Sequence, residues 1–154
     1  MEKKVYKEIN GKKVIAYEKD IYGFEHWYEY DSNGNKIYYK NSGDFEKWYD
    51  YDFNGNLIYT KDNTDYEEWY EYDAKGNKIH FRNNVDYEEW YEYDTNGNMI
   101  HSKDNHGFET WREYNSNGNC IHFNNSNSYE EWKDYDANGK LIHFKNSKGI
   151  EQWL

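Results

Sequence analysis

The segment FEHWYEYDSNGNKI, residues 24–37, decides the fold because it recurs along the chain at a fixed interval. An aromatic residue or Ile stands three positions before each tryptophan of the repeat, and a Glu follows it. The tryptophans recur every 21 residues without an insertion, at Trp27, Trp48, Trp69, Trp90, Trp111, Trp132 and Trp153. A fixed period of this length predicts a repeat protein whose units bury surface against their neighbours.

Each unit is predicted to form two short strands joined by a tight turn. Runs rich in β-formers at residues 24–30 and 36–40 flank the turn residues 31–35, and the period of about 3.6 residues that a helix requires is missing. The turn suits a three-residue loop that ends in a left-handed Gly and pairs Asp31 with Asn35. We therefore expect an all-β fold, an array of about seven 21-residue β-hairpin repeats that forms an extended or coiled, β-solenoid-like sheet.

The register of the strands follows from the assumed loop lengths. With the three-residue turn, Trp27 is predicted to lie opposite Tyr39. A four-residue return loop at residues 41–44 then places Ile37 opposite Trp48. The Trp and Ile columns share one face in this register. We expect that face to be the more buried one, because it has the greater apolar area.

The whole chain, residues 1–154, is predicted to be a single repeat domain. Residues 1–22 hold six of the 19 Lys and Arg residues and depart from the repeat spacing. A Lys-rich first strand is a known way to protect a sheet edge, so this segment is expected to be an N-terminal cap. The hairpin repeats occupy residues 23–154.

Composition and charge limit the partners that the chain can have. Aromatic residues make up 21% of the sequence, which is incompatible with disorder. A net charge of −11 repels phosphates, so nucleic acid is excluded and a basic protein is the expected partner. Cys120 is the single cysteine, which excludes an internal disulfide. No segment resembles a signal peptide or a membrane span, so a cytoplasmic protein with no membrane partner is expected.

The turn motif resembles a known family. Tyr30-Asp31 with Gly34, and the copies of this motif along residues 23–153, resemble the RHS or YD repeat family. Members of this family are bacterial β-hairpin repeats that build coiled sheets and shells around secreted toxins. The chain departs from the family pattern at Asn35, where Arg is usual, and in its added Trp column. The resemblance implies a repeat scaffold, but far too few units are present to enclose a toxin.

Two features invite a metal hypothesis. The Asp-x-Asn-Gly-Asn turns have their Gly at the wrong position for an EF-hand calcium loop, so they are interpreted as structural turns. Histidines also form one column, and neighbours in it are expected to be about 9 to 10 Å apart, too far for shared ligands of one zinc ion. We therefore predict no metal and no cofactor, and surface histidines at His80, His101, His122 and His143.

The acidic columns beside the tryptophans supply the candidate binding residues. A glycosidase needs one pair of carboxylates about 5 to 9.5 Å apart in one pocket, whereas every repeat here offers the same residues, so no catalytic residue is predicted. Two interpretations remain open: a solvated acidic rim that keeps the sheet soluble, or an acidic and aromatic surface that docks a basic protein. The candidate binding residues are Glu67, Trp69, Glu71, Glu88, Trp90 and Glu92.

These features predict a non-enzymatic protein-binding repeat protein. Its most specific form is an acidic immunity or antitoxin protein that neutralises a basic toxin domain. The alternative is a surface or cell-wall module that binds glycan or choline-like ligands through its aromatic faces. A third hypothesis, an enzyme such as a glycosidase, lacks a unique catalytic set. A neighbouring toxin gene would favour the first reading and an export signal the second.

Overall fold

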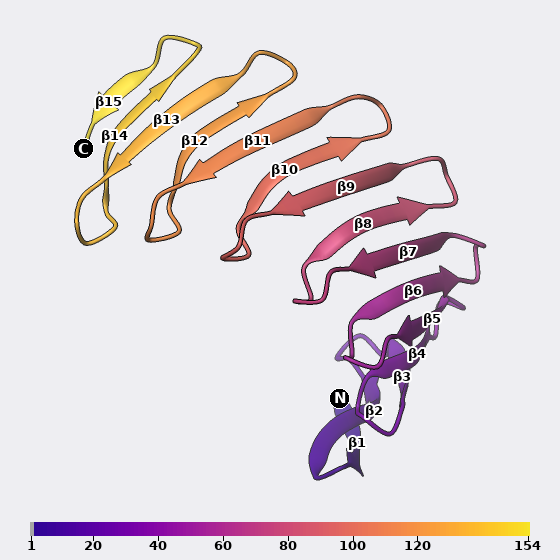
Figure 1. The fold of residues 1–154 in the computed structure, drawn as a ribbon. Helices are drawn as coiled ribbons and strands as arrows, with labels where there is room; N and C mark the ends of the chain where they lie inside the picture. Colours follow the sequence, from indigo (N-terminus) through magenta and orange to yellow (C-terminus); the bar gives the residue numbers. More distant parts are fainter. Residues whose placement is uncertain (1) are drawn as a thin grey trace. The chain divides into compact units, whose positions relative to one another are not determined.

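The computed structural model describes residues 2–154, which contain fifteen β-strands and no helix. The strand order in the sheet is the order along the chain (Figure 1). The prediction of an all-β array of hairpin repeats is therefore confirmed. The strands are β1 (Lys3–Ile9), β2 (Lys12–Lys19), β3 (Glu25–Tyr30), β4 (Lys36–Asn41), β5 (Glu46–Tyr51), β6 (Leu57–Asp62), β7 (Glu67–Tyr72), β8 (Lys78–Asn83), β9 (Glu88–Tyr93), β10 (Met99–Asp104), β11 (Glu109–Tyr114), β12 (Cys120–Asn125), β13 (Glu130–Tyr135), β14 (Leu141–Asn146) and β15 (Glu151–Trp153).

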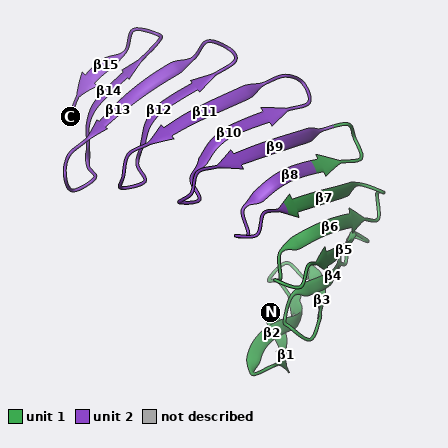
Figure 2. Ribbon diagram, in the orientation of Figure 1, with its two compact units in different colours: residues 1–71, 82–86 green, residues 72–81, 87–154 purple. Residues whose placement is uncertain are grey.

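The chain divides into two compact units, which Figure 2 distinguishes by colour. Unit 1 comprises residues 1–71 and 82–86, and unit 2 comprises residues 72–81 and 87–154. The segment predicted as a cap lies in unit 1, where β1 is the first strand of the sheet and pairs with β2. No helix among residues 2–154 is long and apolar enough to cross a membrane.

The first loop of each repeat has the predicted geometry. Asp31 pairs with Asn35 through an N–H to carbonyl hydrogen bond of 2.9 Å, and Gly34 donates to the carbonyl of Asp31 at 3.2 Å. The φ angle of Gly34 is +88°, in the left-handed region that residues with a Cβ avoid. The Asp31 carboxylate also accepts hydrogen bonds from the amides of Asn33 and Asn35, both at 2.9 Å. The turn chemistry predicted from the sequence is confirmed.

The return loop differs from the prediction. The amide of Asn41 donates to the carbonyl of Phe45 at 3.0 Å, so the loop has three residues, 42–44, rather than four. Asp44 takes the left-handed position with a φ of 59°, which short polar side chains tolerate better than others do. The Asn41 side chain accepts the amide of Gly43 at 2.8 Å and supports the turn.

The return loop is one residue shorter than predicted, and the hairpins accommodate the remaining residue of the repeat as a β-bulge. Between β3 and β4, Tyr30 pairs with Lys36 but Glu29 pairs with Tyr38, so Ile37 is an extra residue in β4. The same irregularity recurs between β5 and β6 in unit 1 and in three hairpins of unit 2. The bulge therefore belongs to the repeat.

The bulge overturns the predicted register. Tyr38, and not Ile37, lies opposite Trp48. The predicted partner of Trp27 is also wrong by one residue, because Lys40 lies opposite it. The error comes from placing the extra residue of the repeat in the return loop, whereas the structure places it in the strand.

Alternation along the strands gives the sheet two faces. The Trp face carries Glu25, Trp27, Glu29, Tyr38, Lys40 and their equivalents in the other repeats. The Tyr face carries His26, Tyr28, Tyr39, Asn41 and their equivalents. Residues 2–154 contain no buried hydrophobic side chain. The buried side chains are small or polar and all lie on the Tyr face: Thr60, Asp62, Ser102, Thr110 and Asn146.

The expectation that the Trp face is the more buried one is therefore wrong. Trp48, Trp90, Trp111 and Trp132 are 37–40% exposed. The Tyr face is better covered because its long phenol side chains lie over small neighbours. Thr60, for example, is 1% exposed and donates to Glu68, which also accepts the hydroxyl of Tyr70.

Successive hairpins are joined by side-chain hydrogen bonds as well as by strand pairing. The Tyr51 hydroxyl donates to the carbonyl of Lys36 at 2.9 Å, and Tyr114 does the same to Met99 in unit 2. At the other end of the strands, the side-chain amide of Asn63 donates to the carbonyl of Asp44 in the preceding return loop at 2.6 Å. These bonds satisfy backbone groups that a small core cannot cover.

Candidate functional site

On the Trp face, each tryptophan packs against an aromatic residue of the preceding strand. In unit 1 this residue is Tyr, as in the Tyr38–Trp48 pair, whose ring centroids are 5.6 Å apart at 42°. In unit 2 it is His, as in the His80–Trp90 pair, at 5.4 Å and 11°. Similar stacks follow at His101–Trp111, His122–Trp132 and His143–Trp153. Aromatic pairs at such distances attract each other beyond their burial.

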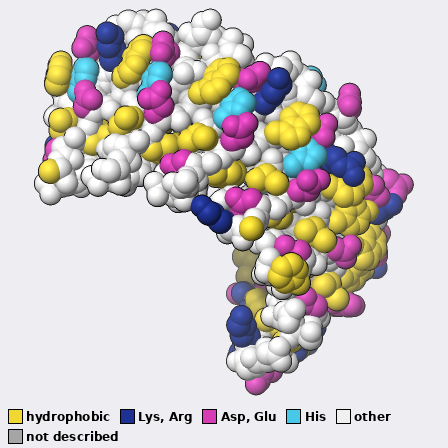
Figure 3. Space-filling model, in the orientation of Figure 1, with side chains coloured by type: hydrophobic (Ala, Val, Ile, Leu, Met, Phe, Trp, Pro, Cys, Tyr) yellow, Lys and Arg dark blue, Asp and Glu magenta, His cyan; other side chains and the backbone are white. Residues whose placement is uncertain are grey.

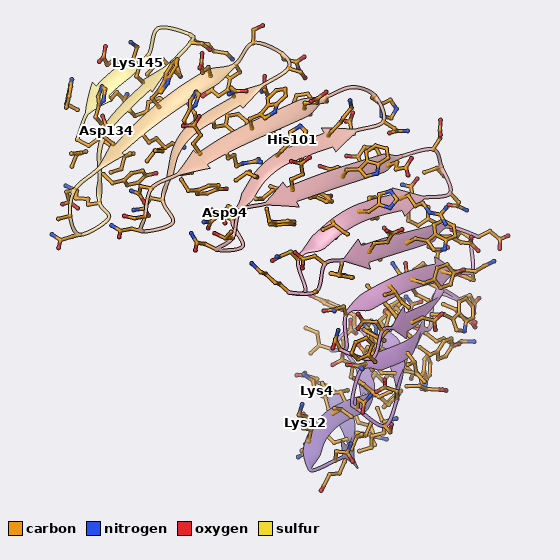
Figure 4. All side chains as sticks on the ribbon, in the orientation of Figure 1. Lys4, Lys12, Asp94, His101, Asp134 and Lys145 are labelled. Carbon is orange, nitrogen blue, oxygen red and sulfur yellow. The ribbon has the colours of Figure 1, made fainter. Side chains whose placement is uncertain are left out.

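The histidines of unit 2 lie between carboxylates. The Nδ1 atom of His143 is 2.9 Å from Asp134, and its Nε2 atom is 3.0 Å from Glu151. Figure 4 shows Asp134 and His101 on the strands of this unit. The four histidines predicted at the surface lie on the Trp face, where their imidazoles are partly exposed, at 12–21%. Among residues 2–154, no three acidic, His or Cys side chains converge on a position for a metal ion.

These contacts raise the pKa of two of the imidazoles, His122 and His143. The hydrogen bond with Asp134 raises the pKa of His143 above its usual value, although burial opposes the change. Burial lowers the pKa of His122, but its hydrogen bonds with Glu130 and Glu113 outweigh that effect and the net change is upward. His122 and His143 therefore hold a proton more strongly than a free imidazole does.

The predicted site residues of β7 share the Trp face: Glu67, Trp69 and Glu71. Glu67 accepts the hydroxyl of Tyr59 at 3.0 Å and pairs with Lys61 at 3.2 Å. The guanidinium of Arg82 lies 4.0 Å from the ring centroid of Trp69. Glu71 is exposed.

The predicted site residues of β9 form a second triplet: Glu88, Trp90 and Glu92. Glu88 is 2.8 Å from Nε2 of His80. Glu92 is 3.5 Å from Nδ1 of His101 and its side chain is 68% exposed. Trp90 is 40% exposed. The structure thus brings each triplet together on one strand, as the sequence predicted.

The two acidic columns of the Trp face differ in a way that sequence reasoning missed. The first column, which includes Glu46 and Glu67, is bound within the sheet, and the hydrogen bond with Lys40 lowers the pKa of Glu46. The second column, which we call the rim column, consists of Glu29, Asp50, Glu71, Glu92, Glu113 and Asp134. Glu113 and Asp134 are both 69% exposed. Figure 3 shows acidic side chains beside histidine and hydrophobic side chains on the visible face of unit 2.

A shallow pocket on the Trp face of unit 1 was also missed. It has a volume of about 440 Å³ and is lined by Glu29, Ile37, Tyr38 and Trp48. The sequence carries one signal for it, because the column of Tyr38 changes from Tyr to His at His80. Aromatic faces beside carboxylates are the groups that bind organic cations and basic side chains.

Comparison with known proteins gives one family and one fold. The profile of the teneurin YD-shell family matches residues 9–153. No curated protein matches the chain. The crystal structure of TcdB2-TccC3-TEV has a TM-score of 0.73 at 18% identity over 87% of this chain. The Photorhabdus luminescens Tc holotoxin pore has a TM-score of 0.74 at 17% identity over 91% of this chain. The chain spans only 8% and 9% of the lengths of those two chains.

Proposed function

Since the chain belongs to the teneurin YD-shell family, we propose that it acts by binding another protein and has no catalytic activity. The Trp face is the binding surface, and the partner segment is basic. The observation that carries this proposal is the rim column, which in each unit provides exposed carboxylates beside half-exposed tryptophans.

The two parts of this surface contribute differently to binding. Exposed tryptophans such as Trp90 supply apolar area that a partner can bury, and Trp is enriched among residues that dominate binding energy. Rim carboxylates such as Glu92 are open to solvent, so they act mainly on the rate of association and its salt dependence. The net charge of −11 adds a field of the same sign.

The specific form of the proposal is an acidic immunity or antitoxin protein that neutralises a basic toxin domain in the cytoplasm. Its support is the acidic Trp face and the resemblance of the repeats to those that form shells around toxins. A basic toxin would meet complementary charge along the rim column.

The experiment removes charge from the rim column while keeping its shape. The rim variant carries Glu71→Gln and Glu92→Gln. The matched control carries Asp44→Asn and Asp86→Asn, which removes two charges from loop positions with positive φ that Asn tolerates. Wild type and both variants serve as baits in native lysate, and a protein retained by wild type is purified for kinetic measurement.

The rim variant should associate more slowly, on the order of threefold to tenfold at low salt, with a weaker salt dependence. The loop-charge control should bind as wild type does. If the two variants slow association equally, only net charge matters, and the rim column is a solubility feature and not a binding surface.

A further inference from the structure

The pocket on the Trp face of unit 1, which we call the Glu29 pocket, has the size of a small-molecule site. Its volume of about 440 Å³ lies within the range of roughly 300 to 1,000 Å³ that ligand pockets occupy. It is lined by Glu29 from β3, Ile37 and Tyr38 from β4, and Trp48 from β5. Glu29 belongs to the rim column, but none of these four residues is among the six candidate binding residues named from the sequence.

Strand pairing places the three polar and aromatic side chains of the pocket in a row. Glu29 lies directly opposite Tyr38, and Tyr38 lies directly opposite Trp48. The two rings are tilted by 42° with centroids 5.6 Å apart, so they do not close against each other as parallel rings would. Trp48 is 39% exposed. The pocket therefore offers ring surface to a ligand, with a carboxylate at one end.

The Glu29 carboxylate makes no hydrogen bond or ion pair with any of residues 2–154. In unit 2 the equivalent carboxylates are bound by imidazoles, as in the 3.3 Å contact between Glu113 and Nδ1 of His122. In unit 1 the imidazole is replaced by Tyr38, whose hydroxyl is hydrogen-bonded to Glu46 on the opposite side. The negative charge at the Glu29 pocket is therefore left for an external cation.

Two other repeats place one of their own cations on the equivalent tryptophan. The Arg82 guanidinium lies 4.0 Å from the ring centroid of Trp69, in unit 1. In unit 2 the Lys145 ammonium lies 5.8 Å from the ring centroid of Trp132. Trp48 has no such cation among residues 2–154. Two repeats thus hold a cation at this ring, and at Trp48 the position is open.

Two lysines of the Trp face, Lys61 and Lys40, are held by carboxylates other than Glu29. Lys61 lies opposite Trp48 in the sheet, but its ammonium is bound by Asp65 at 3.1 Å and Glu67 at 3.2 Å. The ammonium of Lys40 is bound by Glu46 at 2.9 Å. Neither lysine lines the pocket.

We propose that the Glu29 pocket binds an alkylammonium group. The rings of Tyr38 and Trp48 face the cation, the Glu29 carboxylate balances its charge, and Ile37 contacts its carbon substituents. A quaternary ammonium in a free small molecule and the side chain of a lysine share this chemistry. The inference does not rest on the proposed function, because a free small cation satisfies it without a protein partner.

The test titrates the intact chain with two cations at constant ionic strength. The probes are choline and an amide-blocked lysine, and the uncharged isostere of choline, with carbon in place of nitrogen, is the control ligand. The readout is the indole N–H resonance of Trp48, assigned with the Trp48→Phe variant. At least one cation should shift this resonance saturably and the neutral isostere should not. The cation that acts at the lower concentration identifies the source of the ligand.

Two variants distinguish cation binding at the Glu29 pocket from general attraction of cations to the acidic chain. Glu29→Gln should weaken cation binding about tenfold, the effect expected when one charge-assisted contact is lost. Glu113→Gln, at the equivalent position in unit 2, should leave binding unchanged because His122 already binds that carboxylate. Glu29 is exposed and has no partner among residues 2–154, so Glu29→Gln should keep the unfolding curve of wild type as a check of the fold.

A third variant introduces into unit 1 the histidine that unit 2 has at the position of Tyr38. Tyr38→His should bind the Glu29 carboxylate internally and abolish cation binding. The inference is overturned if neither cation shifts Trp48, if the neutral isostere shifts it equally, or if Glu29→Gln and Glu113→Gln have the same effect. Even then, the rim variant with Glu71→Gln and Glu92→Gln could still slow association with a protein partner. Failure of the cation site can therefore be told apart from failure of the proposed function.

Discussion

Replacing tryptophans of one column tests how much of the stability resides on the half-exposed Trp face. Trp90 and Trp153 occupy equivalent positions and both stack on His, but Trp90 is 40% exposed and Trp153 is 74% exposed. Truncation to Ala should therefore cost more at Trp90. The difference between the two variants measures burial, because the chemistry of the replaced side chain is the same.

The magnitude follows from the buried area. A fully buried Trp hides roughly 250 Å², so the exposures leave about 150 Å² hidden at Trp90 and about 65 Å² at Trp153. At about 25 cal/mol per Å², and after a reduction of roughly a third for the compactness of the unfolded chain, Trp90→Ala costs about 2–3 kcal/mol. The same estimate gives about 1 kcal/mol for Trp153→Ala. The first value lies below the roughly 3–5 kcal/mol of a core tryptophan.

Urea unfolding followed by far-UV circular dichroism measures both free energies of unfolding. The slope with urea should stay the same in wild type and variants, so that the change in midpoint reports stability. Equal losses at Trp90 and Trp153 would refute the burial argument. A loss above about 4 kcal/mol at Trp90 would mean that the Trp face is covered in solution.

The other predictions concern the turns and the histidines. Gly97→Ala should lower the free energy of unfolding by about 1–2 kcal/mol through backbone strain alone, because φ is +86° and the new Cβ meets only Asn77 Oδ1 at 3.6 Å. In the same urea assay Gly97→Asn should lower it less. Equal losses for the two variants would contradict a backbone origin. His143 should titrate above its usual pKa, since Asp134 raises it. Its stabilising charge is fully present below the unfolded pKa of about 6.5 and is lost as the pH rises through the folded pKa. In an NMR titration, Asp134→Asn should lower the pKa of His143; an unchanged value would show that the contact does not form.

The sequence determined the features that depend on residues close together in the chain. The 21-residue period predicted the hairpin repeats, and Asp31 with Gly34 predicted the first loop and its positive φ. Alternation along one strand was also enough to place Glu88, Trp90 and Glu92 on the same face. These properties follow from the steric preferences of a few consecutive residues.

The register required information that the sequence does not contain. Two three-residue loops with unbroken strands would place Trp27 opposite Tyr39 and Tyr39 opposite Lys47, so Trp48 would fall on the other face. One extra residue per repeat returns every Trp to the same face of the sheet. A return loop that is one residue longer and a bulge in a strand both supply that residue. Only the tertiary structure places the extra residue at Ile37.

Burial and the chemistry of the site were also decided by the tertiary structure. Both faces of the sheet are aromatic, so apolar content alone chose the wrong face. The Tyr face is the better covered because its phenols reach small residues and carbonyls on neighbouring strands. Likewise, Glu29 and Glu113 are equivalent in sequence, but only Glu113 meets an imidazole on the next strand. Contacts across strands depend on register, and a shift of one residue changes every partner.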